Sequence, residues 1–367
     1  MKISVTQEKL AKALNNVSRV AVGRVTLPVL NNVLIRVDNK KVSLITTNLD
    51  MAIIDFLPVS DSEDGVITVP AKLLAEFISN LPKGEVVTIE SKNTKITIKS
   101  GKYSSTINGS PADDFPELPE INEEKAVVFK IGIDEFKNSI NQVVISASND
   151  LTRPALTGVF FNTTDKTLSI AATDGYRLTE KKLIKNVKSE VSVIVPATSL
   201  QEVLRSISED MEEVEISFNE DLVRFRLGEV EIISKLIDAS YPEYQKLIPK
   251  DNDIKIILKR DEFIRVTKLA SLFARRSASG SITLEAKTPD IFSVKSIASE
   301  LGENDSIITT DVAKDAKINL NSRFLNDALN VLDEPEITAE LGSRTSPIIL
   351  RNTKNPDYTH IIMPLNT

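Results

Sequence analysis

The apolar positions of this chain follow two spacings in turn, one typical of β-strands and one typical of α-helices. Ile3 and Val5 alternate with polar residues, and the apolar residues from Leu10 to Val17 then follow at helical spacing. Further alternating segments come next, and residues 67–98 repeat the same succession. One strand, one helix and several strands, repeated along the chain, predict a strand-rich α+β protein with antiparallel sheets.

The same apolar framework returns when the first 116 residues are moved forward by 126 positions. Val5 then falls on Ile131, and Leu10 falls on Phe136. Loop segments coincide as well: residues 27–30 fall on 153–156, 47–48 on 173–174, 69–71 on 195–197 and 115–117 on 241–243. A fainter third copy places residues 134–136 on 261–263 at a shift of 127. Agreement over a whole domain length indicates tandem copies of one domain.

Three copies give units of about 122 residues, a usual size for a domain with its own core. We place the domains at residues 1–125, 126–250 and 251–367. About two dozen short strands and six helices are expected, and Thr6, Asp134 and Asp261 are the clearest helix caps. The predicted helices cover residues 6–20, 71–80, 134–147, 197–208, 261–276 and 322–332. Acidic stretches with proline, at 113–119 and 247–252, are expected to connect the domains.

The composition is that of an ordinary globular protein, with 41% hydrophobic and 26% charged residues. No apolar run is long enough to span a bilayer, and the N-terminus opens into a strand pattern and not into a secretion signal. We therefore expect a cytoplasmic protein that does not bind a membrane. The absence of cysteine excludes disulfides and thiolate metal sites.

Catalytic chemistry finds little support in the sequence. Gly101-Lys102 is the only Gly-Lys pair, and no glycine precedes it by five residues, so the phosphate-binding P-loop is absent. His360, the only histidine, is expected to be a solvated residue of the last strand, and acidic clusters such as 61–64 are expected to be solvated loop charge. We expect a non-catalytic protein that needs no cofactor and no metal.

The charge distribution suggests a partner. The net charge is −7, and because the predicted helices sum to +3, the remaining residues carry −10. Slightly positive helices in an acidic chain can face a polyanion, since the local potential governs contact with phosphates. The alternative interpretation is that the lysines and arginines lie on ordinary solvated helix faces. The best individual candidates for phosphate contact are Arg24, Arg205, Arg275 and Arg276.

Several motifs together resemble one family, the bacterial sliding clamps, which are the beta subunits of DNA polymerase III. They are the threefold repeat, Arg24 to Leu30 (RVTLPVL), Ala172 to Leu178 (ATDGYRL), Tyr241 to Tyr244 (YPEY) and the terminal Met363-Pro364-Leu365. Their order and spacing extend the resemblance over the whole chain. It implies a head-to-tail homodimer closed into a ring of six similar domains, with helices lining the hole and sheets outside. Such a ring encircles double-stranded DNA without sequence preference and tethers the polymerase.

The resemblance also implies a groove between the second and third domains that binds short partner peptides. The implied partners are the polymerase III alpha subunit, the clamp loader and other proteins that carry motifs of the type Gln-Leu-x-Leu-Phe. The groove residues carried over from the family are Leu156, Thr173, Gly175, Tyr176, Arg177, Leu178, Pro242, Lys246, Leu247, Asn321, Ile362, Met363, Pro364 and Leu365. At the dimer seam the family implies Ile107, Leu272 and Phe273. We expect charged side chains to pair across the same seam, with Glu300, Glu303 and Asp305 on one side and Lys95, Lys99 or Lys102 on the other.

Taken alone, these residues have structural interpretations too: Gly175 is typical of a hairpin turn, and Leu156 and Leu178 are typical of a core. Other classes of protein were also weighed. A non-catalytic repeat scaffold would bind another polyanion or other proteins. A carbohydrate-binding repeat would expose aromatic residues, of which the chain has only 5%. A carboxylate hydrolase would place paired acids in a pocket. Neither of the last two explains residues 173–178 together with the C-terminal tail.

Overall fold

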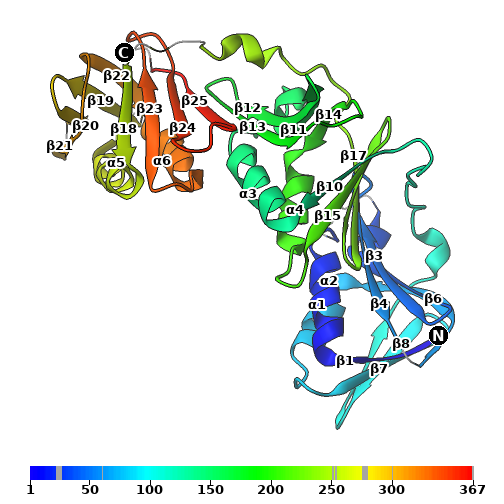
Figure 1. Ribbon diagram of the computed structural model, residues 1–367. Helices are drawn as coiled ribbons and strands as arrows, with labels where there is room; N and C mark the ends of the chain where they lie inside the picture. Colours follow the sequence, from blue (N-terminus) through cyan, green and yellow to red (C-terminus); the bar gives the residue numbers. More distant parts are fainter. Residues whose placement is uncertain are drawn as a thin grey trace. The chain divides into compact units, whose positions relative to one another are not determined.

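The computed structural model describes residues 1–21, 27–59, 61–249, 252, 254–274, 280–299 and 301–365. Six α-helices lie within this part of the chain, as the periodicity predicts (Figure 1). They are α1 (Gln7–Ser18), α2 (Ala71–Ser79), α3 (Ile133–Val144), α4 (Ala197–Ser206), α5 (Arg260–Ala274) and α6 (Ser322–Val331). None of the helices described combines the length and the apolar composition that a bilayer crossing requires.

The described strands occur in the same order around the helices in each repeat. In the first repeat they are β1 (Lys2–Thr6), β2 (Asn32–Asp38), β3 (Lys41–Thr47), β4 (Met51–Pro58), β5 (Ser62–Glu63), β6 (Gly65–Pro70), β7 (Val86–Lys92), β8 (Lys95–Ser100) and β9 (Tyr103–Asn108). In the second they are β10 (Val127–Gly132), β11 (Gly158–Thr164), β12 (Thr167–Thr173), β13 (Arg177–Lys185), β14 (Ser192–Pro196), β15 (Glu213–Phe218), β16 (Leu222–Leu227) and β17 (Val230–Lys235). In the third they are β18 (Ile254–Lys259), β19 (Ser281–Lys287), β20 (Ile291–Ala298), β21 (Gly302–Thr309), β22 (Ala316–Asn321), β23 (Glu336–Leu341), β24 (Ile348–Asn352) and β25 (Tyr358–Ile362).

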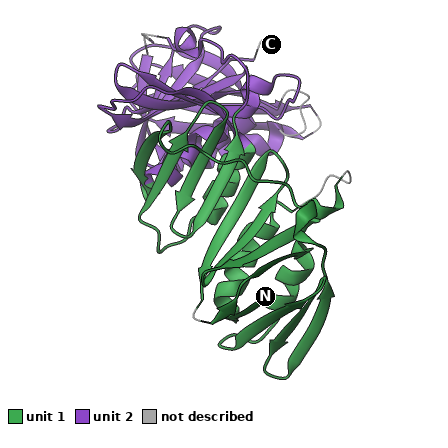
Figure 2. Cartoon of the chain, turned by 90° about the vertical axis from the view of Figure 1, so that its right-hand side faces the viewer, with its two compact units in different colours: residues 1–134, 198–236 green, residues 135–197, 237–367 purple. Residues whose placement is uncertain are grey.

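The chain forms two compact units, residues 1–134 with 198–236 and residues 135–197 with 237–367 (Figure 2). The first unit holds a five-stranded sheet (β5-β1-β7-β8-β9) and an eight-stranded sheet (β10-β15-β16-β17-β4-β3-β2-β6). The second holds an eight-stranded sheet (β14-β11-β12-β13-β25-β24-β23-β18) and a four-stranded sheet (β21-β20-β19-β22). Each unit therefore contains strands of more than one repeat, and the domain boundaries after residues 125 and 250 stay predictions.

Both eight-stranded sheets are assembled from two successive repeats. In the first unit β4 pairs antiparallel with β17, and Ile53 lies opposite Ile232. In the second unit β13 pairs antiparallel with β25, and Thr179 lies opposite His360. The fourth strand of one repeat thus pairs with the last strand of the next repeat at both junctions, in corresponding register.

Each connector between repeats packs over the outer side of such a junction. Phe115 and Ile121 of the first connector form an apolar cluster with residues of β2, β3, β4, β16 and β17. Tyr244 of the second connector, with Tyr241 and Ile248 beside it, packs on residues of β12, β13, β24 and β25. The segments between the repeats therefore cover the lines along which the repeats join. The predicted stretches 113–119 and 247–252 supply Phe115 and Ile248 to these clusters, and the other residues named lie just outside them.

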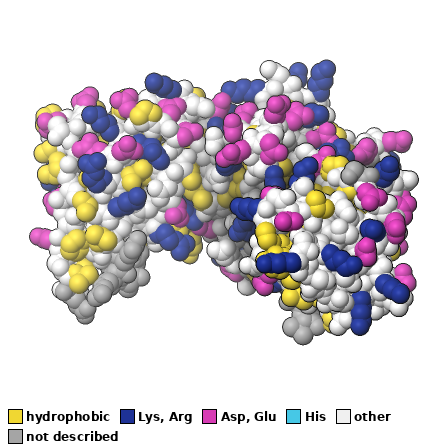
Figure 3. Space-filling view, turned by 90° about the horizontal axis from the view of Figure 1, so that it is seen from below, with side chains coloured by type: hydrophobic (Ala, Val, Ile, Leu, Met, Phe, Trp, Pro, Cys, Tyr) yellow, Lys and Arg dark blue, Asp and Glu magenta, His cyan; other side chains and the backbone are white. Residues whose placement is uncertain are grey.

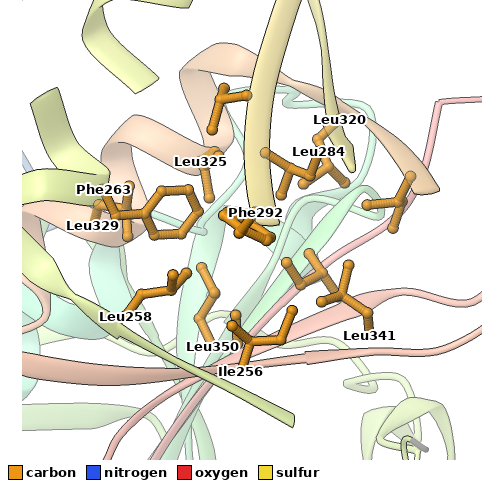
Figure 4. Close-up of a cluster of buried hydrophobic side chains, with 14 of the residues drawn as sticks. Ile256, Leu258, Phe263, Leu284, Phe292, Leu320, Leu325, Leu329, Leu341 and Leu350 are labelled. Carbon is orange, nitrogen blue, oxygen red and sulfur yellow. The ribbon is translucent and has the colours of Figure 1, made fainter. Parts of the chain in front are cut away.

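The core of the third repeat shows how the helices attach to the sheets. Phe263 of α5 lies with its ring edge toward Phe292 of β20, with centroids 5.5 Å apart and planes at 84° (Figure 4). Leu258 of β18, Leu325 of α6 and Leu350 of β24 belong to the same buried cluster. The apolar face of each helix is therefore the face that packs on the strands of its own repeat.

The structure corrects two details predicted from the sequence. Asp134 and Asp261 do not precede their helices, because α3 begins at Ile133 and α5 at Arg260, so both carboxylates lie in the first turn, where the helix dipole favours negative charge. His360 is not solvated: its exposed fraction is 0%, and its Nδ1 lies 2.9 Å from the Tyr358 hydroxyl. Burial lowers the pKa of His360 to about 3, so the ring is neutral at physiological pH.

Asp55 is the carboxylate buried most deeply at the junction of the first two repeats. Its exposed fraction is 5%, and its Oδ2 accepts a hydrogen bond of 2.9 Å from the side chain of Asn16 on α1. Burial raises the pKa of Asp55 to about 6, and Glu229 acts in the same direction, whereas the Asn16 hydrogen bond and the charges of Lys12 and Arg19 act against it. The ionised carboxylate therefore costs stability at neutral pH.

We predict that Asp55→Asn stabilises the protein at pH 7.5. The folded-state pKa lies above the unfolded value of 3.8, so the stabilisation from protonating Asp55 is complete below pH 3.8 and is lost as the pH rises through 6. An asparagine keeps the hydrogen bond without the charge, so the free energy of unfolding should rise by about 1–3 kcal/mol at pH 7.5, with the gain disappearing toward pH 4. Denaturant unfolding at both pH values, with the exposed Asp38→Asn as control, measures this. A gain that does not depend on pH would contradict it.

Candidate functional site

A tight turn between β12 and β13 forms the centre of the predicted groove, and it is held by its own side chains. Thr173 Oγ1 donates to the carbonyl of Arg177 at 2.7 Å and accepts from the amide of Gly175 at 3.1 Å. Asp174 Oδ1 accepts from the amides of Tyr176 and Arg177 at 2.9 and 3.0 Å. Gly175 has φ +90°, a backbone conformation that glycine adopts without strain.

Arg177 connects this turn to the third repeat. Its exposed fraction is 6%, its Nε lies 3.1 Å from Asp174 Oδ2, and its Nη1 lies 2.7 Å from Asp327 Oδ2 on α6. The guanidinium carbon also lies 4.5 Å from the centroid of the Phe324 ring. A buried arginine held on both sides by carboxylates cannot rotate freely, so Arg177 fixes the position of the turn relative to α6.

The C-terminal tail forms a second wall. The amide of Met363 donates to the carbonyl of Tyr176 at 2.8 Å, and the amide of Leu365 donates to the carbonyl of Asn319 at 2.8 Å. The Tyr176 ring lies stacked near Phe324 with centroids 6.5 Å apart. Backbone hydrogen bonds therefore bring the tail against the turn and against β22.

The second connector supplies an aromatic wall. Tyr241 stacks on Phe160 with centroids 4.7 Å apart and planes at 7°, and Tyr244 lies edge-on to both rings. Burial raises the pKa of both tyrosine hydroxyls, so both stay neutral. Leu178 packs in the same cluster. The wall therefore presents rigid apolar surface to the groove.

Large apolar side chains remain uncovered around this wall. The exposed fraction is 65% for Tyr176, 63% for Leu247 and 44% for Met363. Exposed apolar side chains gathered at one place mark a binding surface more often than scattered ones do. These three residues come from the turn, the connector and the tail, which are far apart in the sequence.

The other predicted groove residues lie in the same elements. Leu178 and Ile362 are buried in the strands, and Leu156 is half-buried in the 3-10 turn, Pro154–Thr157, that precedes β11. Pro242 and Lys246 are exposed in the connector, where Lys246 pairs with Glu243. Asn321 caps α6: its side-chain Oδ1 accepts a hydrogen bond of 2.9 Å from the amide of Arg323, so this oxygen already has a partner. Pro364 is half-buried in the tail.

The first repeat contains the same turn without the exposed leucine of the connector. Thr47 Oγ1 donates to the carbonyl of Met51 at 2.9 Å and accepts from the amide of Leu49 at 3.0 Å, as Thr173 does in its own turn. Ile121, which corresponds to Leu247 at the 126-residue shift, has an exposed fraction of only 8%. The turn is therefore a property of the repeat, whereas the exposed leucine is specific to the junction of the second and third repeats.

Two residues that position the groove were missed from the sequence. Phe324 and Asp327 lie on α6, about 150 residues from the arginine that they hold, a separation of the order that only tertiary packing can bridge. No local pattern marks them, because on their own helix they continue an ordinary amphipathic face.

Of the predicted DNA contacts, only Arg205 can be placed, because Arg24, Arg275 and Arg276 lie outside the described residues. Arg205 is on α4 and is exposed, and it pairs with Glu202, which also pairs with Arg19 at 2.9 Å. Exposed ion pairs are weak, on the order of 0.2–1 kcal/mol, so a phosphate can compete for Arg205.

The described helices carry further basic side chains that the sequence analysis did not select. Every helix has at least one exposed lysine or arginine: Lys9, Lys12, Lys72, Lys137, Arg205, Arg265, Lys268 and Arg323. Acidic and basic side chains are interspersed on the face in Figure 3. Scattered cations of this kind suit contact with a phosphate backbone and give no means of reading bases.

The predicted seam residues lie on helix α5 of the third repeat and on edge strand β9 of the first. Leu272 on α5 has an exposed fraction of 58%, and Phe273 beside it is half-buried. Ile107 is on β9, the edge strand of the five-stranded sheet, and its exposed fraction is 6%. Ile107 therefore packs mainly within its own sheet in the single chain, whereas Leu272 is uncovered.

Three family models match consecutive parts of the chain. They are the N-terminal domain of the DNA polymerase III beta subunit at residues 1–119, its central domain at 130–243 and its C-terminal domain at 245–366.

Curated relatives and solved structures agree with these models. The chain is 30% identical over its full length to the beta sliding clamp of Bacillus subtilis and 28% identical to that of Staphylococcus aureus, and both matches cover 100% of each protein. The structure is similar to the DNA polymerase sliding clamp of Bacillus subtilis, with a TM-score of 0.94 and 29% identity over 100% of this chain and 99% of the other. It is also similar to the sliding clamp of Pseudomonas aeruginosa bound to griselimycin, with a TM-score of 0.94 and 26% identity over 100% of both chains.

Proposed function

This chain belongs to the family of DNA polymerase III beta subunits, and as a member it is a non-catalytic DNA sliding clamp built from three tandem clamp domains, from which we propose how it assembles and what it binds. The observation that carries the function is the match of three consecutive domain models along one chain. The proposal is a head-to-tail homodimer in the cytoplasm that encircles double-stranded DNA and tethers the polymerase III alpha subunit.

The two junctions inside the chain predict the seam between two chains. Both pair the fourth strand of one repeat with the last strand of the next. The fourth strand of the third repeat, β21, and the last strand of the first repeat, β9, have no such partner within the chain. Each is the edge strand of its sheet among the described strands. An unpaired edge is a template for another strand, so β21 of one subunit pairs with β9 of the partner subunit in this proposal.

The register of that seam follows from the hairpins. When the hairpins β3–β4, β12–β13 and β20–β21 are superposed, Ile53, Thr179 and Asn304 occupy equivalent positions. When the hairpins β16–β17, β24–β25 and β8–β9 are superposed, Ile232, His360 and Ser105 do so as well. The partners Ile53 and Ile232, like Thr179 and His360, lie opposite each other inside the chain. Asn304 should therefore lie opposite Ser105 of the partner subunit.

The seam should also be more polar than the two internal junctions. Asp305 corresponds to Ile54, whose side chain is buried beneath the first connector. Asp305 pairs instead with Lys295 at 3.2 Å. Lys99 and Lys102 of the partner subunit would lie near Asp305, while Leu272 and Phe273 supply the apolar contact on the helix side.

The remaining contacts follow the arrangement of the elements. Arg24, Arg205, Arg275 and Arg276, together with the other exposed cations of the helices, face the duplex and bind phosphates without reading sequence. The groove formed by the turn, the connector and the tail takes the leucine and aromatic side chains of partner peptides from the polymerase, the clamp loader and other clamp-binding proteins. Leu247 and Met363 are its apolar anchors, and Thr173 and Arg177 lie on its polar side.

The seam register is testable by cross-linking, because the natural chain contains no cysteine. The amide of Phe56 donates to the carbonyl of Glu229, and the amide of Lys182 donates to the carbonyl of Asp357, both at 2.9 Å across a junction. Hydrogen-bonded and non-hydrogen-bonded pairs alternate along an antiparallel ladder, so the pairs three residues earlier, Ile53–Ile232 and Thr179–His360, are non-hydrogen-bonded. Such pairs have Cα atoms about 4.5 Å apart, within the range of a disulfide. Ser105→Cys with Asn304→Cys should therefore oxidise to a covalent dimer, seen by electrophoresis without reductant.

The matched control moves one cysteine by a single residue. Ser104→Cys with Asn304→Cys places the two side chains on opposite faces of the sheet, so it should stay monomeric in denaturing gels. Equal cross-linking of both variants, or none in the first, would show that the register is wrong.

Encirclement predicts that DNA topology controls retention. Loaded by clamp loader and ATP, the clamp should stay on nicked circular DNA at least about tenfold longer than on linear DNA with free ends, because only an end lets a closed ring slide off. Arg24→Ala with Arg205→Ala should reduce loading and leave the dimer intact. Gel filtration of the reaction at fixed salt measures retention, and equal lifetimes on the two DNAs would contradict encirclement.

Deleting residues 363–367 tests the groove. The deletion removes the Met363 anchor, and because a few buried anchors carry most of such an interface, a labelled Gln-Leu-x-Leu-Phe peptide should lose 2 kcal/mol or more, roughly thirtyfold in affinity. Lys235→Ala is the matched control, since Lys235 holds the corresponding place at the other junction. Fluorescence anisotropy gives both affinities, and an unchanged affinity of the truncated clamp would place the peptide site elsewhere.

A further inference from the structure

A cavity of about 700 Å³ lies in the first unit, away from the groove and the seam. It is bounded by α1, the end of β4, residues 210–213 and the turn between β16 and β17. Its size is in the range that holds a small molecule. The clamp function described above does not use it.

Asp55 lies in the wall of this cavity with one oxygen unused. Oδ2 accepts the bond from Asn16, whereas Oδ1 has no hydrogen-bond partner among the described residues. Oδ1 is not one of the fully enclosed polar atoms that lack a partner in the described part of the chain. An atom that has no partner and is not fully enclosed must be accessible, so Oδ1 is open to the cavity. A side chain that is 95% buried therefore directs a carboxylate oxygen toward an empty space.

The charge of Asp55 is not required by the packing. An asparagine would accept the same bond from Asn16, and burial of the carboxylate raises its pKa to about 6. A buried carboxylate that costs stability and faces a cavity is typical of a binding site for a cation.

The charges that line the cavity leave an excess of two negative groups. Ion pairs within the lining join Lys12 to Asp210 at 3.6 Å, Lys130 to Glu213 at 3.1 Å and to Glu215 at 3.6 Å, and Arg226 to Glu215 at 3.2 Å. Among the described residues of the lining, three anions take part in no ion pair: Asp55, Glu212 and Glu229. Lys9 is the one cation of this described lining that takes part in none. Three unpaired anions and one unpaired cation match a dication.

Apolar side chains complete the site. Leu57 of β4, Met211 and Val230 of β17 also line the cavity, so it offers aliphatic surface between its charged groups. We propose that this cavity binds a small aliphatic diamine, with one ammonium group on Asp55 Oδ1 and the other toward Glu229 or Glu212. The methylene stem would lie on Leu57 and Met211, because an alkyl chain between two ammonium groups needs apolar contact.

The test uses the full-length clamp and 1,4-diaminobutane as the probe, by isothermal titration calorimetry at pH 7.5 and low salt. The natural protein should bind the diamine, and Asp55→Asn should weaken the affinity at least tenfold, whereas the exposed Asp38→Asn, which does not line the cavity, should leave it unchanged. 1-Aminobutane, with a single charge, should bind at least tenfold more weakly than the diamine.

A second variant tests the other end of the site. Glu229 is exposed, so Glu229→Gln leaves the core intact and should weaken diamine binding at least threefold. Absence of binding to the natural protein overturns the proposal. So does an unchanged affinity in a folded Asp55→Asn variant, or an equal affinity for 1-aminobutane. Each of these outcomes leaves the clamp function untouched.

Discussion

Antiparallel pairing between strands of successive repeats is the interaction on which the rest of this structure depends. No repeat completes its sheets alone: β4 needs β17, and β13 needs β25. The backbone groups of a strand edge require partners, and supplying them from the next repeat joins the repeats and fixes their register at once. The connectors then pack over these joints, and the helices cover the other side of the same strands. The seam proposed between subunits applies this rule a third time.

The proposed partner groove lies where the repeats differ in one small respect. The turns at Thr47 and Thr173 make the same hydrogen bonds, so the scaffold of the groove is common to two repeats. What differs is the connector, where Ile121 is buried and Leu247 is exposed. In the proposed groove, specificity would therefore come from one side chain that is exposed instead of buried, on a backbone that the repeat already provides.

The sequence predicted the fold well, because the periods of helices and strands are local consequences of which face is buried. All six helices and the threefold order of strands could be predicted in this way. The alternation of Tyr358, His360 and Ile362 also carried a signal that His360 faces inward, but its polar ring outweighed that signal in the interpretation.

The groove was a different case. Its residues came from a family resemblance and not from periodicity, and the side chains that position Arg177 could not be found because they approach it from a distant helix. The first residues of α3 and α5, Ile133 and Arg260, could not be predicted from the sequence either. A carboxylate stabilises the first turn of a helix as well as the cap position, so Asp134 and Asp261 fit either place.

The connectors have one more consequence. In the proposed ring, the two joints inside each subunit are crossed and covered by continuous chain, whereas the joint between subunits brings together two separate chains. When one seam of a dimeric ring parts, the other still holds the two subunits together, so closing it again is an intramolecular event. Its rate then depends on the effective concentration of β9 near β21, and not on how much clamp the cell contains. A ring of this design can open for DNA and close again even when the protein is dilute.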